Sequence, residues 1–433
     1  MKFSLGKPKP LIKLMTSAQV SQGLSAFLMS LQRGGVMEFL TSIGIILLCG
    51  LLLGSICKTI KLPPLLGMLI VGIVLGPHVL NLISPQVLDI SSDLRQLALI
   101  VVLTRAGLSF NVNELRKNGR SAVLLCFVPA IMEIIGYIIF GILLLKISWN
   151  EAALLGCVMA AVSPAVIVPR MLKLKEQGYG TDKGIPQMIL TGASADDVFV
   201  IILFTAFLGM SGGNGFDFNI LWRTPVSIVL GIGVGLLIGC LFALVVKRFH
   251  IRDTVKIIIL LCFSFFFVSI ENHVSAYVPF SGLLAVIAMS AMLYRTHKEC
   301  AERLSVRYNK LWVVAEILLF VLVGAIVDIS FAVKSGGMIV AVIAIALVFR
   351  IAGVYLCVIR TKLNMKERLF CAIAYTPKAT VQAAIGGIPL ALGLACGSIV
   401  LTAAVLAIII TAPLGALLID LLYKKLLAKD IAT

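Results

Sequence analysis

The chain has 433 residues, of which 60% are hydrophobic and 13% charged, and its mean hydropathy is +1.09. Soluble domains carry about 25% charged residues, so the composition excludes a water-soluble protein and predicts an all-α polytopic membrane protein. The net charge of +17 would suggest nucleic acid for a soluble chain. In a membrane protein it fits basic cytoplasmic loops better, and we expect no nucleic-acid partner.

The first 36 residues form a basic, proline-containing N-terminal segment with a weakly apolar stretch at 11–31, which could be an interfacial helix or an additional span. Apolar segments long enough to cross a bilayer as helices follow, so we expect 13–14 transmembrane helices. In chain order the predicted spans, helices 1 to 13, are 38–57, 62–80, 94–110, 121–145, 151–172, 184–210, 225–247, 254–272, 279–294, 311–331, 336–360, 366–390 and 396–423.

The loop Lys and Arg residues lie on one side of the membrane. Only Arg95, Lys146, Arg223 and Lys334 fall in the alternate loops. The positive-inside rule therefore places the other loops and the C-terminus in the cytoplasm, and we expect an integral protein of the plasma membrane. The basic N-terminus favours the same side, which would require 11–31 to span the membrane.

Helix 6, at 184–210, carries two adjacent carboxylates, Asp196 and Asp197, near its middle. An ionised Asp at the bilayer centre costs roughly 2.5–3.5 kcal/mol on insertion scales, so such residues usually mark an ion or proton pathway. Oxygens around Ser163, Pro164 and Thr191 could complete a shell for a hard monovalent cation. The alternative is that the two acids only bridge neighbouring basic groups.

Two predicted spans contain helix breakers at corresponding positions. Helix 5 carries Ser163-Pro164, and helix 12 carries Thr376-Pro377-Lys378 followed by Gly386-Gly387. Proline removes a backbone donor, and broken backbone at membrane depth is tolerated only inside protein or beside water. The two spans are seven apart, so the halves have opposite topology, as in an inverted repeat with interrupted helices at a transporter site.

Two further spans, helices 4 and 11, carry charges near their middles: Glu133 and Arg350. Two further basic residues, Arg105 and Lys378, also lie away from the ends of their spans. We expect Lys378, with Thr380, to lie at the helix crossing, where its charge would neutralise the carbonyl ends of the half-helices. The scattered cysteines and histidines show no ligand spacing, so no cofactor and no resident metal is expected.

Several stretches together resemble the NHA-type, paired-aspartate branch of the monovalent cation–proton antiporters. The most specific are PKATVQAAIG (377–386), and AAVSPAVIVPRML (160–172) with GASADDV (192–198); weaker matches are LTRAGLSFNV (103–112), FVPAIMEI (127–134) and GYGTDKGIP (178–186).

The resemblance implies a homodimer of elevator-type antiporters in which interrupted helices 5 and 12 cross beside the acids. Asp197 would be the ion-binding, proton-exchanging carboxylate and Asp196 its partner, while Glu133 and Arg350 would form a buried pair. Many paired-acid relatives have Lys where this chain has Arg350. Because arginine stays protonated, this difference puts electrogenic exchange in doubt.

The predicted spans and the resemblance together give an expected domain organisation. Residues 1–36 are the N-terminal segment, 37–210 the first half (helices 1–6), 211–253 a linker with helix 7, and 254–433 the second half (helices 8–13). The mobile core would be helices 4–6 and 11–13, and the dimer scaffold helices 1–3 and 8–10.

The predicted function is exchange of Na⁺ or Li⁺ for H⁺, with Asp197 holding one or the other, and no enzymatic activity. Alternatives are a potassium/proton antiporter and a sodium-coupled organic anion symporter, although acids at the crossing argue against an anion pocket. A passive channel is disfavoured by the titratable pair. An intramembrane aspartyl protease is disfavoured because its two Asp would lie on different helices and share a proton.

Overall fold

The computed structural model describes residues 38–109, 119–211, 218–249, 251–274 and 277–429, and every named element within these ranges is a helix. The predicted extra span at 11–31 lies outside the described residues. The elements in chain order are α2 (Phe39–Thr59), α3 (Pro64–Leu75), α4 (Pro85–Asp89), α5 (Ser91–Leu108), α7 (Gly119–Leu125), α8 (Val128–Phe140), η1 (Gly141–Leu145), α9 (Trp149–Ala160), α10 (Pro164–Glu176), α11 (Ile185–Ser211), α12 (Phe218–Arg248), α13 (Asp253–Val274), α14 (Gly282–Thr296), α15 (Lys298–Ala325), α16 (Ile329–Val358), α17 (Met365–Ala374), α18 (Thr380–Ile385), α19 (Ile388–Ala391) and α20 (Gly397–Leu426).

Each of the thirteen predicted spans coincides with one of these helices or with consecutive pieces of a broken one, which confirms the all-α membrane class. In the described ranges nine helices are long and apolar enough to cross a membrane, whereas α3 and α14 are shorter. The outer faces are apolar: on α2, for example, Leu48 is 59% and Leu52 56% exposed. Such faces suit contact with lipid rather than water.

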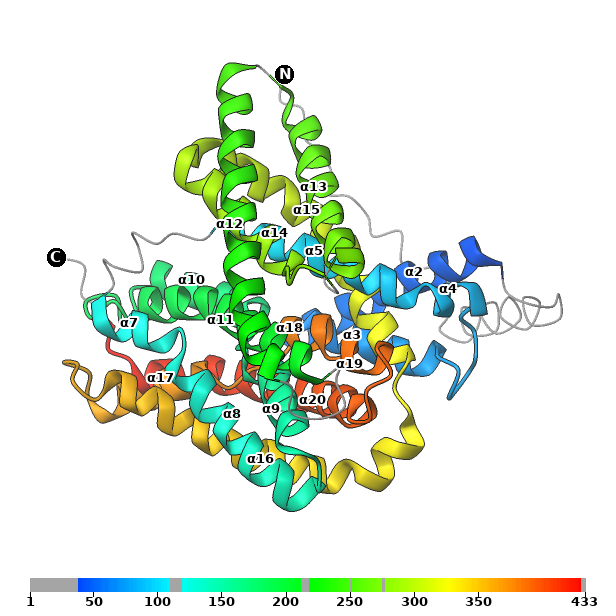
Figure 1. Ribbon diagram of the computed structural model, residues 1–433. Coiled ribbons are helices and arrows are strands. Elements are labelled where there is room, and N and C mark those ends of the chain that lie inside the picture. Colours follow the sequence, from blue (N-terminus) through cyan, green and yellow to red (C-terminus); the bar gives the residue numbers. More distant parts are fainter. Residues whose placement is uncertain (1–37, 110–118, 212–217, 250, 275–276, 430–433) are drawn as a thin grey trace, which may run out of the picture.

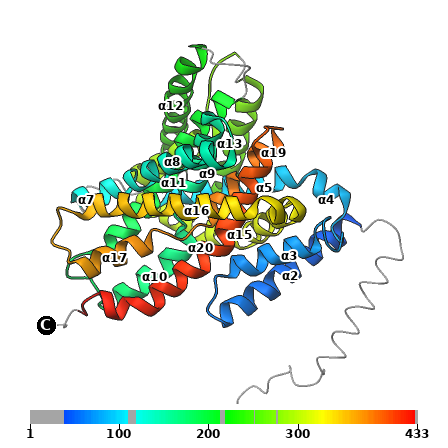
Figure 2. The same ribbon diagram turned by 90° about the horizontal axis from the view of Figure 1, so that it is seen from below.

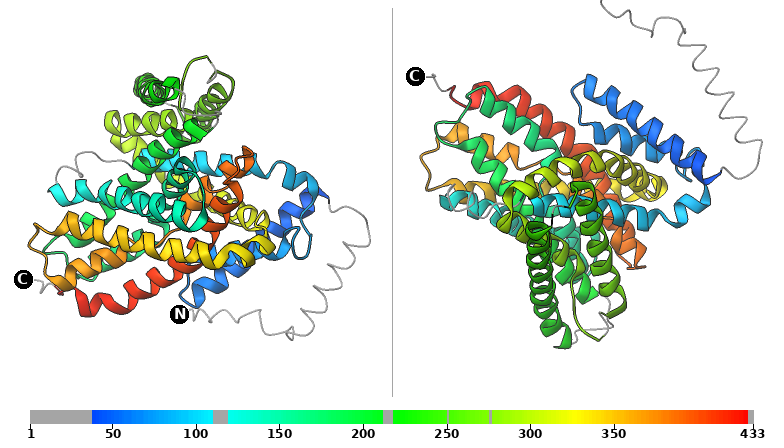
Figure 3. Two further views of the ribbon diagram at one scale, coloured as in Figure 1. Left: turned by 60° about the horizontal axis from the view of Figure 1, so that its bottom comes forward. Right: turned by 90° about the horizontal axis from the view of Figure 1, so that it is seen from above.

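The helices pack in two groups that meet in the centre of the structure (Figure 1). In one group α8 runs beside α16, and α9, α10, α11, α17, α18 and α20 pack around them. In the other, α3 packs between α2 and α15, and α5 and α12–α15 complete the group; α2 and α3 lie side by side in Figure 2, and α12 and α13 project from the rest in Figure 3. The predicted domain boundaries, and a mobile core against a dimer scaffold, stay predictions.

Two helices are interrupted, and the interruptions touch. Helix α9 ends at Ala160 and α10 begins at Pro164, and between them Ala161 and Ser163 are extended. Helix α17 ends at Ala374 and α18 begins at Thr380, so this second stretch is also interrupted. Proline has no N–H to continue the helical ladder, which explains both breaks. The N–H of Ser163 donates to the carbonyl of Pro377 at 2.9 Å, and this bond joins the two broken segments where they cross.

Glycines bring α12 and α14 into close contact, but only on one face of α12. Gly231 and Gly235 are buried, and a methyl group on either would overlap a backbone carbonyl, that of Ser281 or Ala285. Gly233 is exposed, with nothing within 4 Å of such a methyl. Gly233 takes no part in this contact, because residues two apart point to different faces of a helix.

We therefore expect Gly235→Ala to destabilise the protein by about 1–3 kcal/mol, the usual range for overpacking. The matched control is Gly233→Ala, which should leave stability unchanged or raise it slightly because alanine favours the helix. Thermal unfolding of the two variants in the same detergent checks this. Equal melting temperatures would contradict the packing assigned to α12 and α14.

Candidate functional site

Asp196 lies in the middle of α11 and is completely buried. Its Oδ2 accepts a hydrogen bond from the N–H of Val162 at 2.9 Å, in the extended segment between α9 and α10, and pairs with Nη2 of Arg350 at 3.0 Å. Asp196 thus supplies an acceptor to backbone that the interruption of the helix leaves unsatisfied. Its bonding is that of a residue that holds the crossing together.

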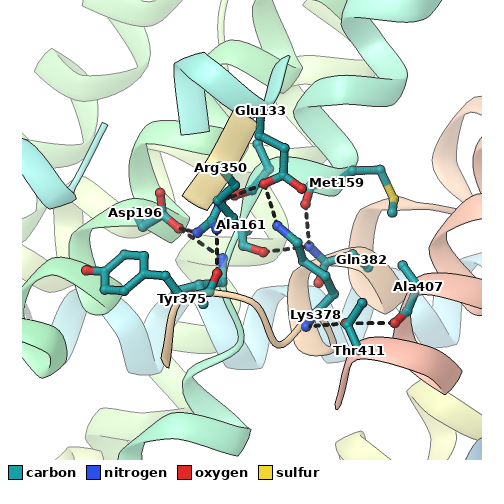
Figure 4. A network of polar contacts seen from close by, with 12 residues as sticks. Glu133, Met159, Ala161, Asp196, Arg350, Tyr375, Lys378, Gln382, Ala407 and Thr411 are labelled. Carbon is teal, nitrogen blue, oxygen red and sulfur yellow. Dashed lines mark hydrogen bonds and ion pairs between the residues drawn. The ribbon is translucent and has the colours of Figure 1, made fainter. Parts of the chain in front are cut away.

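Arg350, from the middle of α16, is the centre of the network in Figure 4 and is fully buried. Its guanidinium pairs with Glu133 on α8 at 2.7 Å as well as with Asp196. It also donates to two main-chain carbonyls, through Nε to Tyr375 at 2.5 Å and through Nη1 to Ala160. The planar fork of arginine can serve several acceptors at once, and here it links both interrupted helices to the two acids.

The position of Lys378 corrects one sequence prediction. Lys378 does lie at the crossing, but its Nζ donates to Oε2 of Glu133 at 2.6 Å rather than to helix-end carbonyls. A buried ammonium group is costly without a counter-charge, and Glu133 provides it. The N–H of Lys378 donates to Oγ1 of Thr411 on α20 at 2.9 Å, and Thr380 is the buried first residue of α18.

The carbonyl ends are bound instead by Arg350 and by a residue that the sequence reasoning missed. Gln382, on α18, donates through Nε2 to the carbonyl oxygens of Ala161 at 2.8 Å and Met159 at 3.3 Å (Figure 4). These carbonyls lie at the end of α9, where helical partners are lacking. The available signal was a polar amide between Val381 and Ala383, in the short apolar stretch after Thr380.

Asp197 faces a different way from its neighbour. It is 9% exposed and lines a small cavity with residues of α5, α11, α14 and α18, that is, at the boundary between the two helix groups. Apart from Asp197 the cavity lining is apolar, and its volume is about 10 Å³, about enough for one water molecule. Within the described ranges no side chain or main-chain group hydrogen-bonds to Oδ1 of Asp197.

The residues of the predicted oxygen shell lie at the start of α10 and on α11. Ser163 ends the extended segment just before α10, and its buried Oγ has no hydrogen-bond partner among the described residues. Pro164 is the first residue of α10, and Thr191 lies on α11 one to two turns before the acids. Ser163 therefore carries a spare oxygen at the crossing, as an ion-binding residue would need, and Thr191 is half-buried.

Two of the three buried acids at the site, Glu133 and Asp196, form ion pairs, and the third, Asp197, forms none among the described residues. Glu133 and Asp196 are balanced by Arg350 and Lys378 through three buried ion pairs. Among the described residues no basic group lies within ion-pair distance of Asp197, although the charge of Arg105 acts on it from farther away, and no cluster of three His, Cys, Asp or Glu side chains could hold a resident metal. A buried carboxylate in this position can be neutralised by a proton or by a small cation.

Comparisons with known proteins agree with one another. The family model described as "Sodium/hydrogen exchanger, transmembrane" matches residues 43–425. Sodium/hydrogen exchanger 9B2 of Mus musculus is 36% identical over 409 residues, covering 89% of this chain and 74% of its own. Sodium/hydrogen exchanger 9B1 of Homo sapiens is 33% identical, covering 85% and 73%. Among solved structures, the sodium proton antiporter MjNhaP1 of Methanocaldococcus jannaschii has a similar fold, with a TM-score of 0.75 at 20% identity, covering 89% of this chain and 97% of that one.

Proposed function

The chain belongs to the sodium/hydrogen exchanger family, and we propose that it is a secondary active antiporter that exchanges Na⁺ or Li⁺ for H⁺ at Asp197. The family match confirms the resemblance drawn from the motifs. The observation that carries the proposal is the position of Asp197: a buried acid that forms no ion pair with a described residue and lines the cavity between the two helix groups, while its neighbour Asp196 is paired with Arg350 at the crossing of the broken helices.

In this mechanism the proton and the cation compete for one carboxylate. Cation binding requires ionised Asp197, and protonation removes the charge that holds the cation. Hard cations favour oxygen ligands, and Ser163 at the crossing offers one. Asp196, held by Arg350 and the N–H of Val162, stays ionised and fixes the geometry. One proton then leaves for each cation bound, so exchange is electroneutral.

We further propose that transport is of the elevator type, in a homodimer in the plasma membrane with the C-terminus in the cytoplasm. The location of Asp197 supports this, because its cavity is walled on one side by α11 and α18 and on the other by α5 and α14. Movement of one helix group against the other would carry the acid from one membrane face to the other. The lining that separates them is apolar, which allows sliding without breaking ion pairs.

The test is a proteoliposome assay with the purified full chain. A pH gradient is imposed, and Na⁺, Li⁺ and K⁺ are added in turn, with and without the membrane potential clamped. Proton movement driven by Na⁺ or Li⁺ at a rate independent of the potential would support the proposal. A response to K⁺ alone, counterflow of an organic anion, or persistent current through the protein would each point to a different transporter class.

Competition at Asp197 also predicts how apparent cation affinity depends on pH. Below the pH at which Asp197 is half protonated, the apparent dissociation constant for Na⁺ should rise about tenfold for each unit of acidification, because one proton must leave before one cation binds. Above that pH the affinity should level off. Titrating Na⁺ at fixed pH values between about 6 and 9 measures this, and an unchanged affinity would contradict the competition.

A further inference from the structure

Arg105, near the end of α5, carries a positive charge that the network around Arg350 does not use. Its side chain is partly buried, and among the described residues its guanidinium forms neither an ion pair nor a hydrogen bond. It lies instead over the ring of Trp312 on α15, with the guanidinium carbon 5.5 Å from the ring centre. A cation–π contact of this kind positions the group but supplies no counter-charge.

The Arg105 side chain starts at the edge of the cavity that Asp197 lines. Val102 and Ala106, on the same helix, belong to the lining of that cavity, and residues three apart are neighbours on a helix surface. Helical side chains lean toward the N-terminus of their helix, so Arg105 extends from its Cα back toward the level of Val102. Asp197 lines the cavity from α11, in the other helix group, and the charges of Arg105 and Asp197 act on each other across the boundary between the groups.

A second acid, Glu316 on α15, also acts on Arg105. It follows Trp312 by four residues and therefore lies on the same face of that helix. Its charge acts on Arg105 more strongly than that of Asp197 does, although neither carboxylate is within ion-pair distance of the guanidinium. Arg105 and Glu316 belong to one helix group and Asp197 to the other. Arg105 thus has one counter-charge within its own group and a second one across the boundary.

The other charged groups around Asp197 already have partners. Asp196 precedes it on α11 and pairs with Arg350, and Glu133 pairs with both Arg350 and Lys378. The parts of α14 and α18 that line the cavity are apolar. Of the described basic groups, Arg105 acts most strongly on Asp197. It is therefore the group that can balance Asp197 when the carboxylate is ionised and empty.

We propose that Arg105 is the counter-charge of Asp197 when that carboxylate holds neither cation nor proton, and that it thereby limits the cation affinity of the site. A positive charge near the acid stabilises its ionised, empty form and repels the incoming cation. Glu316 offsets part of this charge, so it acts on cation binding in the opposite direction. Arg105 is a positioning residue that acts through Asp197, and its role rests on the exchange proposed there.

The test is a titration of Na⁺-driven proton movement in proteoliposomes that contain the purified full chain, over the pH range used for the competition experiment. The apparent dissociation constant for Na⁺ is taken from the concentration that gives half-maximal movement. Arg105→Gln should lower this constant about threefold or more on the alkaline plateau, because one repelling charge is removed. The pH at which Na⁺ affinity begins to fall should also move to the alkaline side, because an acid without its counter-charge keeps its proton to a higher pH.

Glu316→Gln should change the Na⁺ affinity in the opposite direction. It leaves the charge of Arg105 less balanced, so the apparent dissociation constant on the alkaline plateau should rise. Opposite signs separate an effect of charge from structural damage, which would weaken Na⁺ binding in both variants. If Arg105→Gln fails to fold, the sign of the Glu316→Gln effect decides alone.

Two controls accompany these variants. Arg105→Lys keeps the charge and should restore the affinity to within about twofold of the unmodified protein. Arg295→Gln removes an exposed basic residue at the end of α14 that does not line the cavity, and it should likewise change the affinity by less than about twofold.

The outcomes distinguish this role from the exchange itself. Absence of Na⁺-driven proton movement in the unmodified protein would contradict the function proposed for Asp197. Normal exchange with an unchanged Na⁺ affinity in Arg105→Gln, or a change in the same direction in Arg105→Gln and Glu316→Gln, would overturn the role of Arg105 alone.

Discussion

Asp197→Asn is expected to abolish cation–proton exchange while leaving the protein folded. The amide has nearly the shape of the carboxylate but can neither carry the exchanged proton nor offer a negative charge to the cation. Because no described residue pairs with Asp197, the substitution breaks no ion pair, and the melting temperature should stay close to that of the unmodified protein. The measurement is Na⁺-driven proton movement in proteoliposomes, with thermal unfolding as the check on folding.

Two comparisons make this result specific. Asp89→Asn changes an exposed carboxylate at the end of α4 and should leave transport intact. Asp196→Asn removes the negative charge paired with Arg350 but keeps an oxygen that can accept from the N–H of Val162, so it should lower stability, which Asp197→Asn should not. If the Asp197 variant still exchanged cations for protons at the full rate, Asp197 would not be the carrier and the mechanism would be wrong.

The helix interruptions were predictable from sequence because their cause is local. Pro164 and Pro377 each remove a backbone donor inside an apolar span, and the chain breaks beside each of them. The short helix α4 was not predicted, although its signal is also local: Ser84 precedes Pro85, and the serine side chain caps the first turn by accepting from the N–H of Val87. The prediction followed the long apolar segments, and this five-residue helix lies between two of them.

The partners within the site were less predictable because they come from distant parts of the chain. The ion pair between Lys378 and Glu133 joins residues 245 positions apart, and the contact of Gln382 with Ala161 spans 221. A single sequence shows that a buried charge needs a partner, but not which of several acids lies nearest. Helix geometry turns adjacent side chains about 100° apart, but the sequence does not show which of Asp196 and Asp197 faces the crossing.

Arg350→Ala is expected to have the largest effect on stability of any single substitution in the site. The change removes two buried ion pairs, with Glu133 and Asp196, and two hydrogen bonds to main-chain carbonyls at the broken helices. Glu133 keeps Lys378 as a partner, but the remaining charges no longer balance. Breaking a buried pair in this way typically costs about 3–5 kcal/mol, so the melting temperature should fall by several degrees, or the protein should fail to fold.

Arg350→Lys tests whether a positive charge alone is sufficient at this position, without the shape of the guanidinium group. It restores the positive charge, but an ammonium group cannot span two acids and two carbonyls as the guanidinium does, so its stability should lie between those of the unmodified protein and the alanine variant. The control Arg170→Ala breaks a partly exposed pair with Asp420, which should cost at most about 1 kcal/mol. An Arg350→Ala protein as stable as the Arg170→Ala control would mean that Arg350 does not hold the crossing together.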